Sequence, residues 1–404
     1  MNTTVPNING LDRQCSSGRR AGAPRSAGPV LRLPRVVHVL RELAPGGIEY
    51  WLLDLAQAGG VAGFQLEILV ERAGGALEGA FREAGVALGV WSRSRPAQLV
   101  RALRGAAIVH SHVHAASGWI LTLAALAGAP VRLAHSHCCE DPAAQGYGRR
   151  LYAGLMRSLL AIFATEQLAV SAQAGEALFG SRAPVRILPP ARNLRQLPLR
   201  ARRCRAGSCS VGFIGRLVSD KNPGVLLGLL GAFPDLRLIL AGDGPWRGAL
   251  AAAGEGRIEF VTRETVLAQA DCLVLPSFRE GLGLAAIEAQ AAGLPAVLST
   301  GVAAEAVIRP DLVWRVDPHA PLCAWRQAID EAAARARGGG SEDVRWPAAW
   351  DPDGSLYHIE PNRRLLAALY REALNRRRRA GPPAGCWGNR GSGEDLRRTG
   401  RRAA

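Results

Sequence analysis

Two glutamates in one glycine-rich stretch have the types and spacing of a ligand site. Residues 271–295 read DCLVLPSFREGLGLAAIEAQAAGLP, with Gly281 and Gly283 lying between Glu280 and Glu288. Glycines at these positions let a backbone approach a bound group closely, and the helix expected after them offers free N–H groups to an anion. The loop therefore suits a phosphate.

Glu288 has apolar neighbours on nearly every side of this expected helix. An unpaired buried carboxylate costs several kcal/mol, so Glu288 needs a donor partner, and a ribose diol would supply two hydroxyls. In the simpler interpretation, Glu280 is a solvated loop charge and Glu288 is a surface residue.

One lysine stands among 50 basic residues. Arg216 follows the apolar stretch SVGFIG, and Lys221 comes five positions later. Because every other basic residue is arginine, a compact ammonium group is indicated at position 221. One planar guanidinium and one point charge together would hold a diphosphate. The alternative is that Lys221 is a turn residue in SDKNPG.

Two further glycine turns follow apolar stretches. Gly242 to Pro245, GDGP, comes after LRLILA, and Gly46 and Gly47 come after VVHVL. Either turn is a weak signal alone, although such loops let backbone N–H groups approach an anion.

The histidines allow a different chemistry. His110, His112 and His114 alternate, as do His135 and His137. HxH pairs at strand ends gather a metal in some hydrolases. No HExxH motif or CxxC pair accompanies them, so a metal-dependent hydrolase or deacetylase is the minority alternative.

Strands alternate with helices of ten to fifteen residues from Val36 onward. The apolar runs VVHVL, FQLEILV, AAIVHSH, VRLAHSH, QLAVSA and VRILPP come before a charged, Gly/Ser-bearing break, and the alternation restarts with SVGFIG. This pattern predicts an α/β protein with two doubly wound, Rossmann-like domains that face each other across a hinge and cleft. In such sheets ligands lie at the carboxyl ends of the strands, where the residues above are placed.

The 404 residues are 48% hydrophobic, enough for two domains with separate cores. The formal charge of +16 lies mostly at the ends, because residues 1–35 carry +5, residues 376–404 carry +7 and the residues between carry +4. The basicity therefore does not indicate nucleic-acid binding. Both ends are expected to be disordered, either as solvated extensions or as contacts for acidic lipid head groups.

No run of 18 or more apolar residues occurs, so the chain is not expected to span a membrane. Eight scattered cysteines without a CxxC pair favour reduced thiols over a disulfide framework. We therefore expect a cytoplasmic protein whose basic ends allow peripheral binding to the inner face of the cytoplasmic membrane.

Together, these motifs resemble those of the retaining glycosyltransferases of family 4, which have the two-Rossmann-domain fold called GT-B. The likeness covers about residues 36–300 and a final helix. The family's glycine loop, strand-end histidine, diphosphate motif, second glycine turn and long glutamate motif stand here as PGGIE, RLAHSH, GRLVSDK, GDGP and PSFREGLGLAAIEAQAAGLP. PGGIE and AHSH look most like bacterial enzymes that build surface or exported polysaccharides.

The resemblance implies transfer of a sugar, with retention, from a nucleotide-diphosphate sugar to a glycan or lipid-linked glycan. Arg216 and Lys221 would hold the diphosphate and stabilise the leaving charge. Glu288 would bind the ribose, and Glu280 would contact the donor sugar near the reacting carbon. His137 would lie beside that sugar, with His135 as the second choice.

The same resemblance adds backbone positions and excludes cofactors. It assigns to the donor site Gly215, Gly242, Gly244, Thr262, Gly281 and Gly283, and it places Gly46 and Gly47 near the phosphate or acceptor. It implies no metal, since the Arg/Lys pair and a helix N-terminus do the work of a divalent ion. A non-catalytic GT-B-like binding protein is the remaining alternative.

Three positions depart from the family pattern. The small Asn-Gly segment that ends the first domain is PPARN here, from Pro189 to Asn193. The glycine of the turn near the base is Thr262, and the glycine after the lysine is Asn222. The identity of the base is therefore open.

The expected organisation follows from these assignments. It comprises a basic extension (1–35), an acceptor-side domain (36–198), a linker (199–210), a nucleotide-sugar-binding domain (211–350), a helix that packs back on the first domain (351–378) and a basic tail (379–404).

Overall fold

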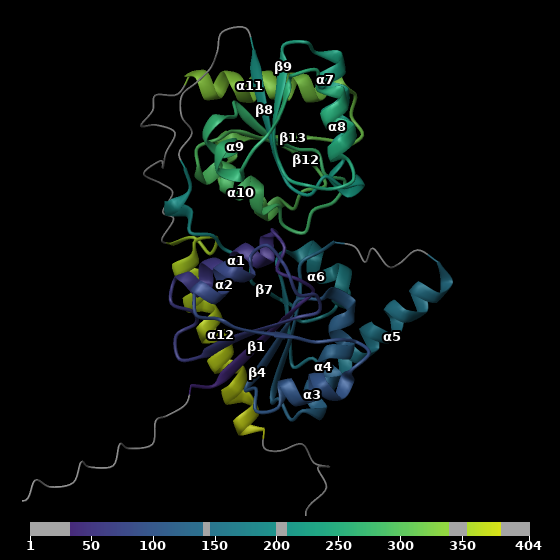
Figure 1. Ribbon diagram of the computed structural model, residues 1–404, viewed down its shortest axis with the longest axis vertical. Helices are drawn as coiled ribbons and strands as arrows, with labels where there is room; N and C mark the ends of the chain where they lie inside the picture. Colours follow the sequence, from purple (N-terminus) through teal and green to yellow (C-terminus); the bar gives the residue numbers. More distant parts are fainter. Residues whose placement is uncertain (1–32, 140–145, 199–207, 339–353, 381–404) are drawn as a thin grey trace, which may run out of the picture. The chain divides into compact units, whose positions relative to one another are not determined.

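Two parallel β-sheets flanked by helices make up the computed structural model (Figure 1). It describes residues 33–139, 146–198, 208–338 and 354–380. The expectations of disorder in 1–35 and 379–404 and of a linker at 199–210 fall largely outside the described residues. The described residues from Pro34 onward form one compact unit that contains both sheets.

The first sheet has seven parallel strands in the order β3-β2-β1-β4-β5-β6-β7. Its strands are β1 (Arg35–Leu40), β2 (Gln65–Val70), β3 (Ala87–Val90), β4 (Ile108–Ser111), β5 (Val131–Ser136), β6 (Glu166–Ala169) and β7 (Arg186–Ile187). The helices between them are α1 (Gly47–Gln57), α2 (Glu78–Glu83), α3 (Pro96–Leu103), α4 (Ser117–Leu126), α5 (Tyr147–Phe163) and α6 (Ala172–Phe179).

The second sheet has six parallel strands in the order β10-β9-β8-β11-β12-β13. Its strands are β8 (Cys209–Ile214), β9 (Leu236–Ala241), β10 (Ile258–Phe260), β11 (Cys272–Leu275), β12 (Ala296–Ser299) and β13 (Val313–Val316). Its helices are α7 (Pro223–Ala232), α8 (Arg247–Ala253), α9 (Arg263–Gln269), α10 (Leu284–Ala291) and α11 (Leu322–Gly338). The predicted α/β class with two Rossmann-like sheets is thus confirmed.

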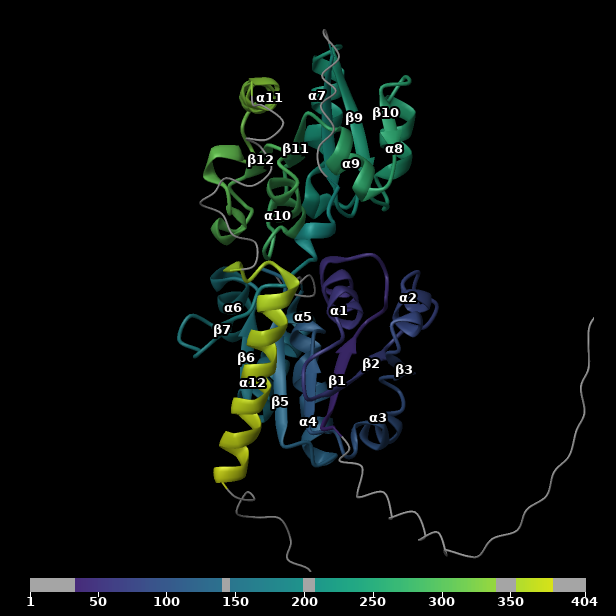
Figure 2. The same cartoon turned by 90° about the vertical axis from the view of Figure 1, so that its left-hand side faces the viewer.

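The last helix, α12 (Ile359–Arg379), packs on the first sheet rather than the second (Figure 2). With α1 and α2 it covers one face of that sheet, while α3, α4, α5 and α6 contribute to the core on the other face. Asn362 fixes its first turns, because the buried amide accepts a hydrogen bond from Trp51 Nε1 (2.9 Å) and donates one to Pro189 O (2.8 Å).

The sequence pattern missed four short elements, namely β3, α3, α6 and β13. Strand β3 is an edge strand without a fully buried residue, so it lacks the apolar run that marks the central strands. Among the described residues, no helix is both long and apolar enough to cross a membrane.

Candidate functional site

The chain brings Lys221 and Glu280 together at the carboxyl ends of β8 and β11. The Lys221 ammonium group forms an ion pair with the Glu280 carboxylate, whose same oxygen accepts a hydrogen bond from the Ser277 hydroxyl (3.1 Å). Both charged side chains keep partial exposure, 17% for Lys221 and 21% for Glu280. Two residues that are 59 positions apart in the sequence therefore share one solvent-accessible polar site.

The loop after Glu280 has room only for glycine. A side chain at Gly281 would overlap with the carbonyl group of His137, and the Ser171 hydroxyl donates a hydrogen bond to the Gly281 carbonyl (2.5 Å). Gly283 is the N-cap of α10 and has φ of 85°, a left-handed conformation that glycine adopts without strain. The structure therefore places His137 beside the loop that carries Glu280.

Arg216 is exposed in the loop that follows β8. That loop packs directly on the GDGP turn after β9, since a Cβ at Gly242 or Gly244 would collide with the backbone of residues 215–217. The N–H of Leu217 donates to the Asp243 carbonyl (2.8 Å) and joins the two loops. Gly215, Gly242 and Gly244 thus serve a close backbone approach at the same edge of the sheet.

Asn222 and Thr262 each have a structural explanation for their departure from the family pattern. Asn222 has φ of 50° and precedes Pro223 at the start of α7, and after glycine asparagine is among the residues that best tolerate this conformation. Thr262 is the N-cap of α9, where its hydroxyl accepts a hydrogen bond from the N–H of Thr265 (3.2 Å).

Glu288 is buried, with 2% exposure, and its partners are two guanidinium groups. Its Oε1 atom lies 2.9 Å from Arg263 Nη1 and 3.2 Å from Arg192 Nη1. Burial raises the pKa of Glu288, while Arg263 and Arg192 oppose this shift. The donor partner that the sequence demanded is therefore supplied within the chain.

Arg192 belongs to the PPARN segment that departs from the family pattern. Besides Glu288, it pairs with Asp54 of α1 (2.8 Å), and its guanidinium carbon lies 4.7 Å from the centre of the Tyr50 ring. Arg263 lies 4.3 Å from the centre of the same ring. The departure thus contributes an arginine to a buried network around Tyr50.

Glu49 is a site candidate that the sequence analysis did not identify. It lies in the first turn of α1, and its carboxyl group occupies the space beside Gly46. Burial raises the pKa of Glu49 to about 7, and the opposing charge of Arg216 lowers it. The PGGIE motif contained this residue, but only the fold shows that its carboxyl group is removed from water and close enough to Arg216 to interact.

Gly47 lies beside α10, because a Cβ at Gly47 would be 3.7 Å from a methyl carbon of Leu284. The loop after β1 therefore adjoins the helix that follows Glu280.

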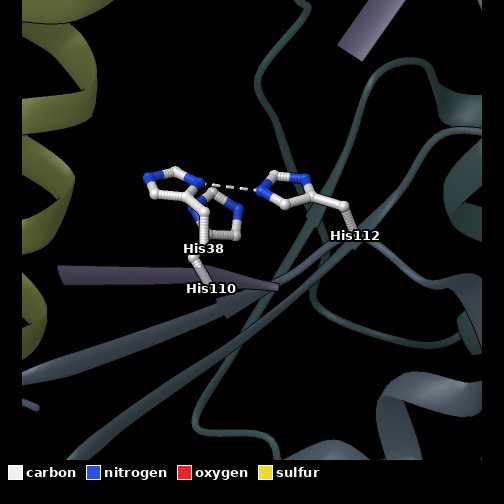
Figure 3. Close-up of side chains that lie close together, drawn as sticks. All are labelled: His38, His110 and His112. Carbon is white, nitrogen blue, oxygen red and sulfur yellow. Dashed lines mark hydrogen bonds between the residues drawn. The ribbon is translucent and has the colours of Figure 1, made fainter. Parts of the chain in front are cut away.

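The histidines form two groups of three whose ligand atoms lie within 4.8 Å of one another. The groups are His38, His110 and His112, and His112, His135 and His137. Figure 3 shows the first group, in which His38 and His112 are hydrogen-bonded. His114 belongs to neither group, although the sequence placed it with His110 and His112.

Among the described residues neither group includes a carboxylate or thiolate. Both ring nitrogens of four of these histidines already form hydrogen bonds. To be bound by these rings, a divalent ion would have to displace some of these hydrogen bonds.

Comparisons with known proteins agree with this architecture. Residues 208–333 match the family model described as "Glycosyl transferases group 1". The "Putative glycosyltransferase EpsF" of Bacillus subtilis (strain 168) is 29% identical over 343 residues, covering 75% of this chain and 88% of EpsF. A D-inositol 3-phosphate glycosyltransferase of Mycobacterium sp. (strain KMS) is 31% identical over 143 residues, covering 31% of this chain and 32% of that protein.

Solved structures show the same fold. Anabaena HepE in complex with UDP aligns with a TM-score of 0.60 at 16% identity, covering 86% of this chain and 98% of HepE. Sucrose-phosphate synthase from Thermosynechococcus elongatus aligns with a TM-score of 0.64 at 19% identity, covering 85% of this chain and 100% of that protein.

The chain therefore has the GT-B fold. Residues 208–333, which contain the second sheet, match the glycosyl transferases group 1 model. It is an enzyme, a glycosyltransferase. These likenesses do not favour the metal-dependent hydrolase or the non-catalytic binding protein.

Glu49 makes the pH dependence of anion binding testable. As the pH rises through about 7, Glu49 ionises and places a negative charge beside the Gly46 loop. We expect the affinity for a nucleoside diphosphate to fall about threefold more between about pH 6 and about pH 8 than in Glu49→Gln, which has no charge to gain. Calorimetric titrations of both proteins across this range would show the difference, and identical pH profiles would contradict it.

Proposed function

We propose that this glycosyltransferase takes its sugar from a nucleotide-diphosphate sugar and transfers it with retention of configuration. The observation that carries the proposal is the Lys221–Glu280 pair at the carboxyl ends of β8 and β11. A lysine would compensate charge on the departing diphosphate, and a carboxylate beside it would face the donor sugar, where positive charge grows during bond cleavage.

The surrounding groups support a diphosphate at this place. Arg216 is exposed in the adjoining loop. Helix α10 begins a few residues after Glu280, with Gly283 as its N-cap, so its first N–H groups follow Gly283 in the sequence. A helix N-terminus and two cations together favour an anion. We propose that these groups replace a metal, so that transfer needs no cofactor, and that uridine diphosphate, present in the Anabaena HepE complex, is a suitable first probe.

Glu288 pairs with two arginines of the chain, so only part of its carboxylate is assigned to the ribose in this proposal. Its carboxylate shares one oxygen between Arg263 and Arg192, so the second oxygen is the atom we assign to a ribose hydroxyl. Replacing Glu288 would leave two guanidinium groups without their shared carboxylate, and the free energy of unfolding would fall along with nucleotide affinity. Glu288 is therefore a poor choice for a kinetic test.

For the acceptor, we propose a glycan or lipid-linked glycan in the synthesis of a bacterial surface or exported polysaccharide. The resemblance of PGGIE and AHSH to such enzymes and the likeness to EpsF support this assignment. A lipid-linked acceptor would require the enzyme to work at a membrane surface.

Helix α5 offers a surface for this contact. Helix α5 has a stripe of exposed apolar residues at helical spacing, formed by Tyr147, Leu151, Leu155 and Ile162. Exposed arginines lie on the same helix. An exposed apolar stripe with basic residues matches an anionic lipid surface. We propose that α5 binds the inner face of the cytoplasmic membrane. The basic tails, which were the sequence-based candidates for this contact, lie outside the described residues apart from their innermost positions.

The diphosphate assignment predicts a split between two ligands for Lys221→Ala. Removing the ammonium group should weaken uridine diphosphate binding about tenfold, equal to about 1.4 kcal/mol, and leave uridine binding nearly unchanged. Calorimetry would measure both affinities. Arg237→Ala is the matched control, since it removes an exposed positive charge at the opposite end of β9. Equal losses for both ligands would remove Lys221 from the phosphate site.

The sugar assignment predicts a different effect for Glu280→Gln. The amide cannot stabilise positive charge on the donor sugar, so kcat should fall about 100-fold while uridine diphosphate affinity stays within about threefold of the original. Steady-state kinetics and a titration would separate the two quantities. Unchanged kcat would contradict the role of Glu280.

The membrane assignment predicts that Leu151→Asp with Leu155→Asp reduces sedimentation with phosphatidylglycerol vesicles about tenfold, because apolar burial in the lipid is lost. Leu126→Asp is the control, as Leu126 is exposed on α4 and should behave like the unaltered protein. Equal sedimentation of all three proteins would show that α5 does not contact lipid.

A further inference from the structure

Five histidines from three neighbouring strands gather on one face of the first sheet. His38 lies on β1, His110 and His112 lie on and just after β4, and His135 and His137 lie on and just after β5. Alternate residues of a strand share a face, and β1, β4 and β5 are adjacent, so the rings stack or tilt against one another.

One continuous line of hydrogen bonds joins these rings to Tyr370 of α12 and to one backbone carbonyl. On one side of Tyr370, the line joins His137 Nε2 to His112 Nδ1 (2.9 Å), then His112 Nε2 to His38 Nδ1 (2.9 Å), and then His38 Nε2 to Tyr370 Oη (3.3 Å). On the other side, it joins Tyr370 Oη to His110 Nδ1 (2.7 Å), then His110 Nε2 to His135 Nδ1 (3.2 Å), and ends with His135 Nε2 at Leu188 O (3.0 Å). Figure 3 shows the link between His38 and His112.

The Leu188 carbonyl gives this line a direction. A carbonyl oxygen only accepts, so His135 must carry its hydrogen on Nε2. In a neutral ring Nδ1 then accepts, so His110 donates from Nε2 and accepts at Nδ1 from the Tyr370 hydroxyl.

The Tyr370 hydroxyl also fixes the hydrogens of His38, His112 and His137 on its other side. Its one hydrogen is used on His110, so its oxygen accepts from His38 Nε2. His38 Nδ1 in turn accepts from His112, and His112 Nδ1 accepts from His137. All five rings are therefore Nε2–H tautomers, and Nδ1 of His137 carries no hydrogen.

Burial keeps the rings neutral, as this direction requires. Removal from water lowers the pKa of His38 and His135 to about 3 and lowers the pKa of His110, His112 and His137 well below the usual value.

We propose that the Leu188 carbonyl, acting through Tyr370 and the histidine line, fixes His137 as a hydrogen-bond acceptor at Nδ1 for a hydroxyl of the donor sugar. The backbone carbonyl of His137 lies against Gly281, next to Glu280, so the residue that ends the line adjoins the loop that carries Glu280. Within the part of the chain that the structure describes, Nδ1 of His137 makes no hydrogen bond, because the ring bonds His112 through Nε2. Tyr370 and the inner histidines are positioning residues. The inference rests on the proposed use of a nucleotide-sugar donor only for the identity of the hydroxyl.

Long-range ¹H–¹⁵N correlation spectra of the full-length protein labelled at histidine test the tautomers without substrate. Near neutral pH we expect the five rings to show the Nε2–H pattern. An imidazolium or an Nδ1–H ring among the five would overturn the proposal, as would displacement of these hydrogens when Zn²⁺ alone is added in stoichiometric amount.

Tyr370→Phe tests the relay while preserving ring shape. It removes the acceptor of His38, so His38, His112 and His137 are free to reverse to Nδ1–H, whereas His110 and His135 stay fixed by Leu188. We expect new Nδ1–H signals and a fall in donor kcat/KM of about tenfold, the loss of one hydrogen bond. Uridine diphosphate affinity should not change.

Tyr357→Phe is the matched control. Its partly buried hydroxyl donates to the Glu305 carbonyl (2.6 Å), which lies outside the line, so its tautomers and kinetics should match those of the unaltered protein. Tyr370→Phe spectra identical to the original would overturn the relay. Absence of transfer from every donor, with the tautomers as expected, would count against the proposed function and leave the fixed tautomers established.

Discussion

The buried carboxylate of Glu288 needs cationic partners close to it, and much of the structure depends on how the chain supplies them. Desolvating such a charge costs several kcal/mol unless cations and donors surround it. Arg263 is the first residue of α9 and Glu288 lies in α10, and both helices belong to the second sheet's domain. Arg192 comes from the segment after β7 of the first sheet. The same arginine binds Asp54 of α1. One buried charge thereby connects elements that lie far apart in the sequence.

The neighbourhood of the candidate site follows from that connection. Tyr50, whose ring packs on both arginines, lies just after the Gly46-Gly47 loop and Glu49. Gly281 meets the carbonyl of His137, and Ser171 donates a hydrogen bond to Gly281. Residues from the ends of β1, β5 and β6 are thus brought to the loop after β11. Small residues are needed there because two backbones approach each other closely.

The strands of both sheets and the residues at their carboxyl ends could be predicted from local sequence patterns. Central strands are buried on both faces and appear as apolar runs, so both sheets could be predicted, whereas the edge strand β3 lacks that pattern. The short helix α3 does have an apolar side, formed by Leu99 and Leu103, and the sequence analysis overlooked it. Lys221 and Glu280 stood out by type and by their position at strand ends, and the structure brings them into contact. Their roles, like those of Arg216 and His137, remain predictions.

The partners of buried polar groups could not be predicted. Arg192 lay in the PPARN segment, which stood out only as a departure from the family pattern. Tyr370 lies 260 residues from His110 and 332 residues from His38, the two histidines that it contacts. Glu49 was part of the PGGIE motif, but only the fold showed its burial and its interaction with Arg216. Such pairings depend on which residues the tertiary structure juxtaposes, and no spacing along the chain encodes that.

In the proposed reaction a nucleotide-diphosphate sugar is the donor, and the protein's own cations stabilise the leaving group. The most direct measurement is release of nucleoside diphosphate from a panel of nucleotide sugars, with glycan and lipid-linked glycan acceptors, in the presence of a chelator. We expect acceptor-dependent release from at least one donor at an undiminished rate in the chelator, with the donor's anomeric configuration kept in the product. Release that stops in the chelator and returns with a divalent ion would contradict the proposed reaction, and so would release of sugar to water alone.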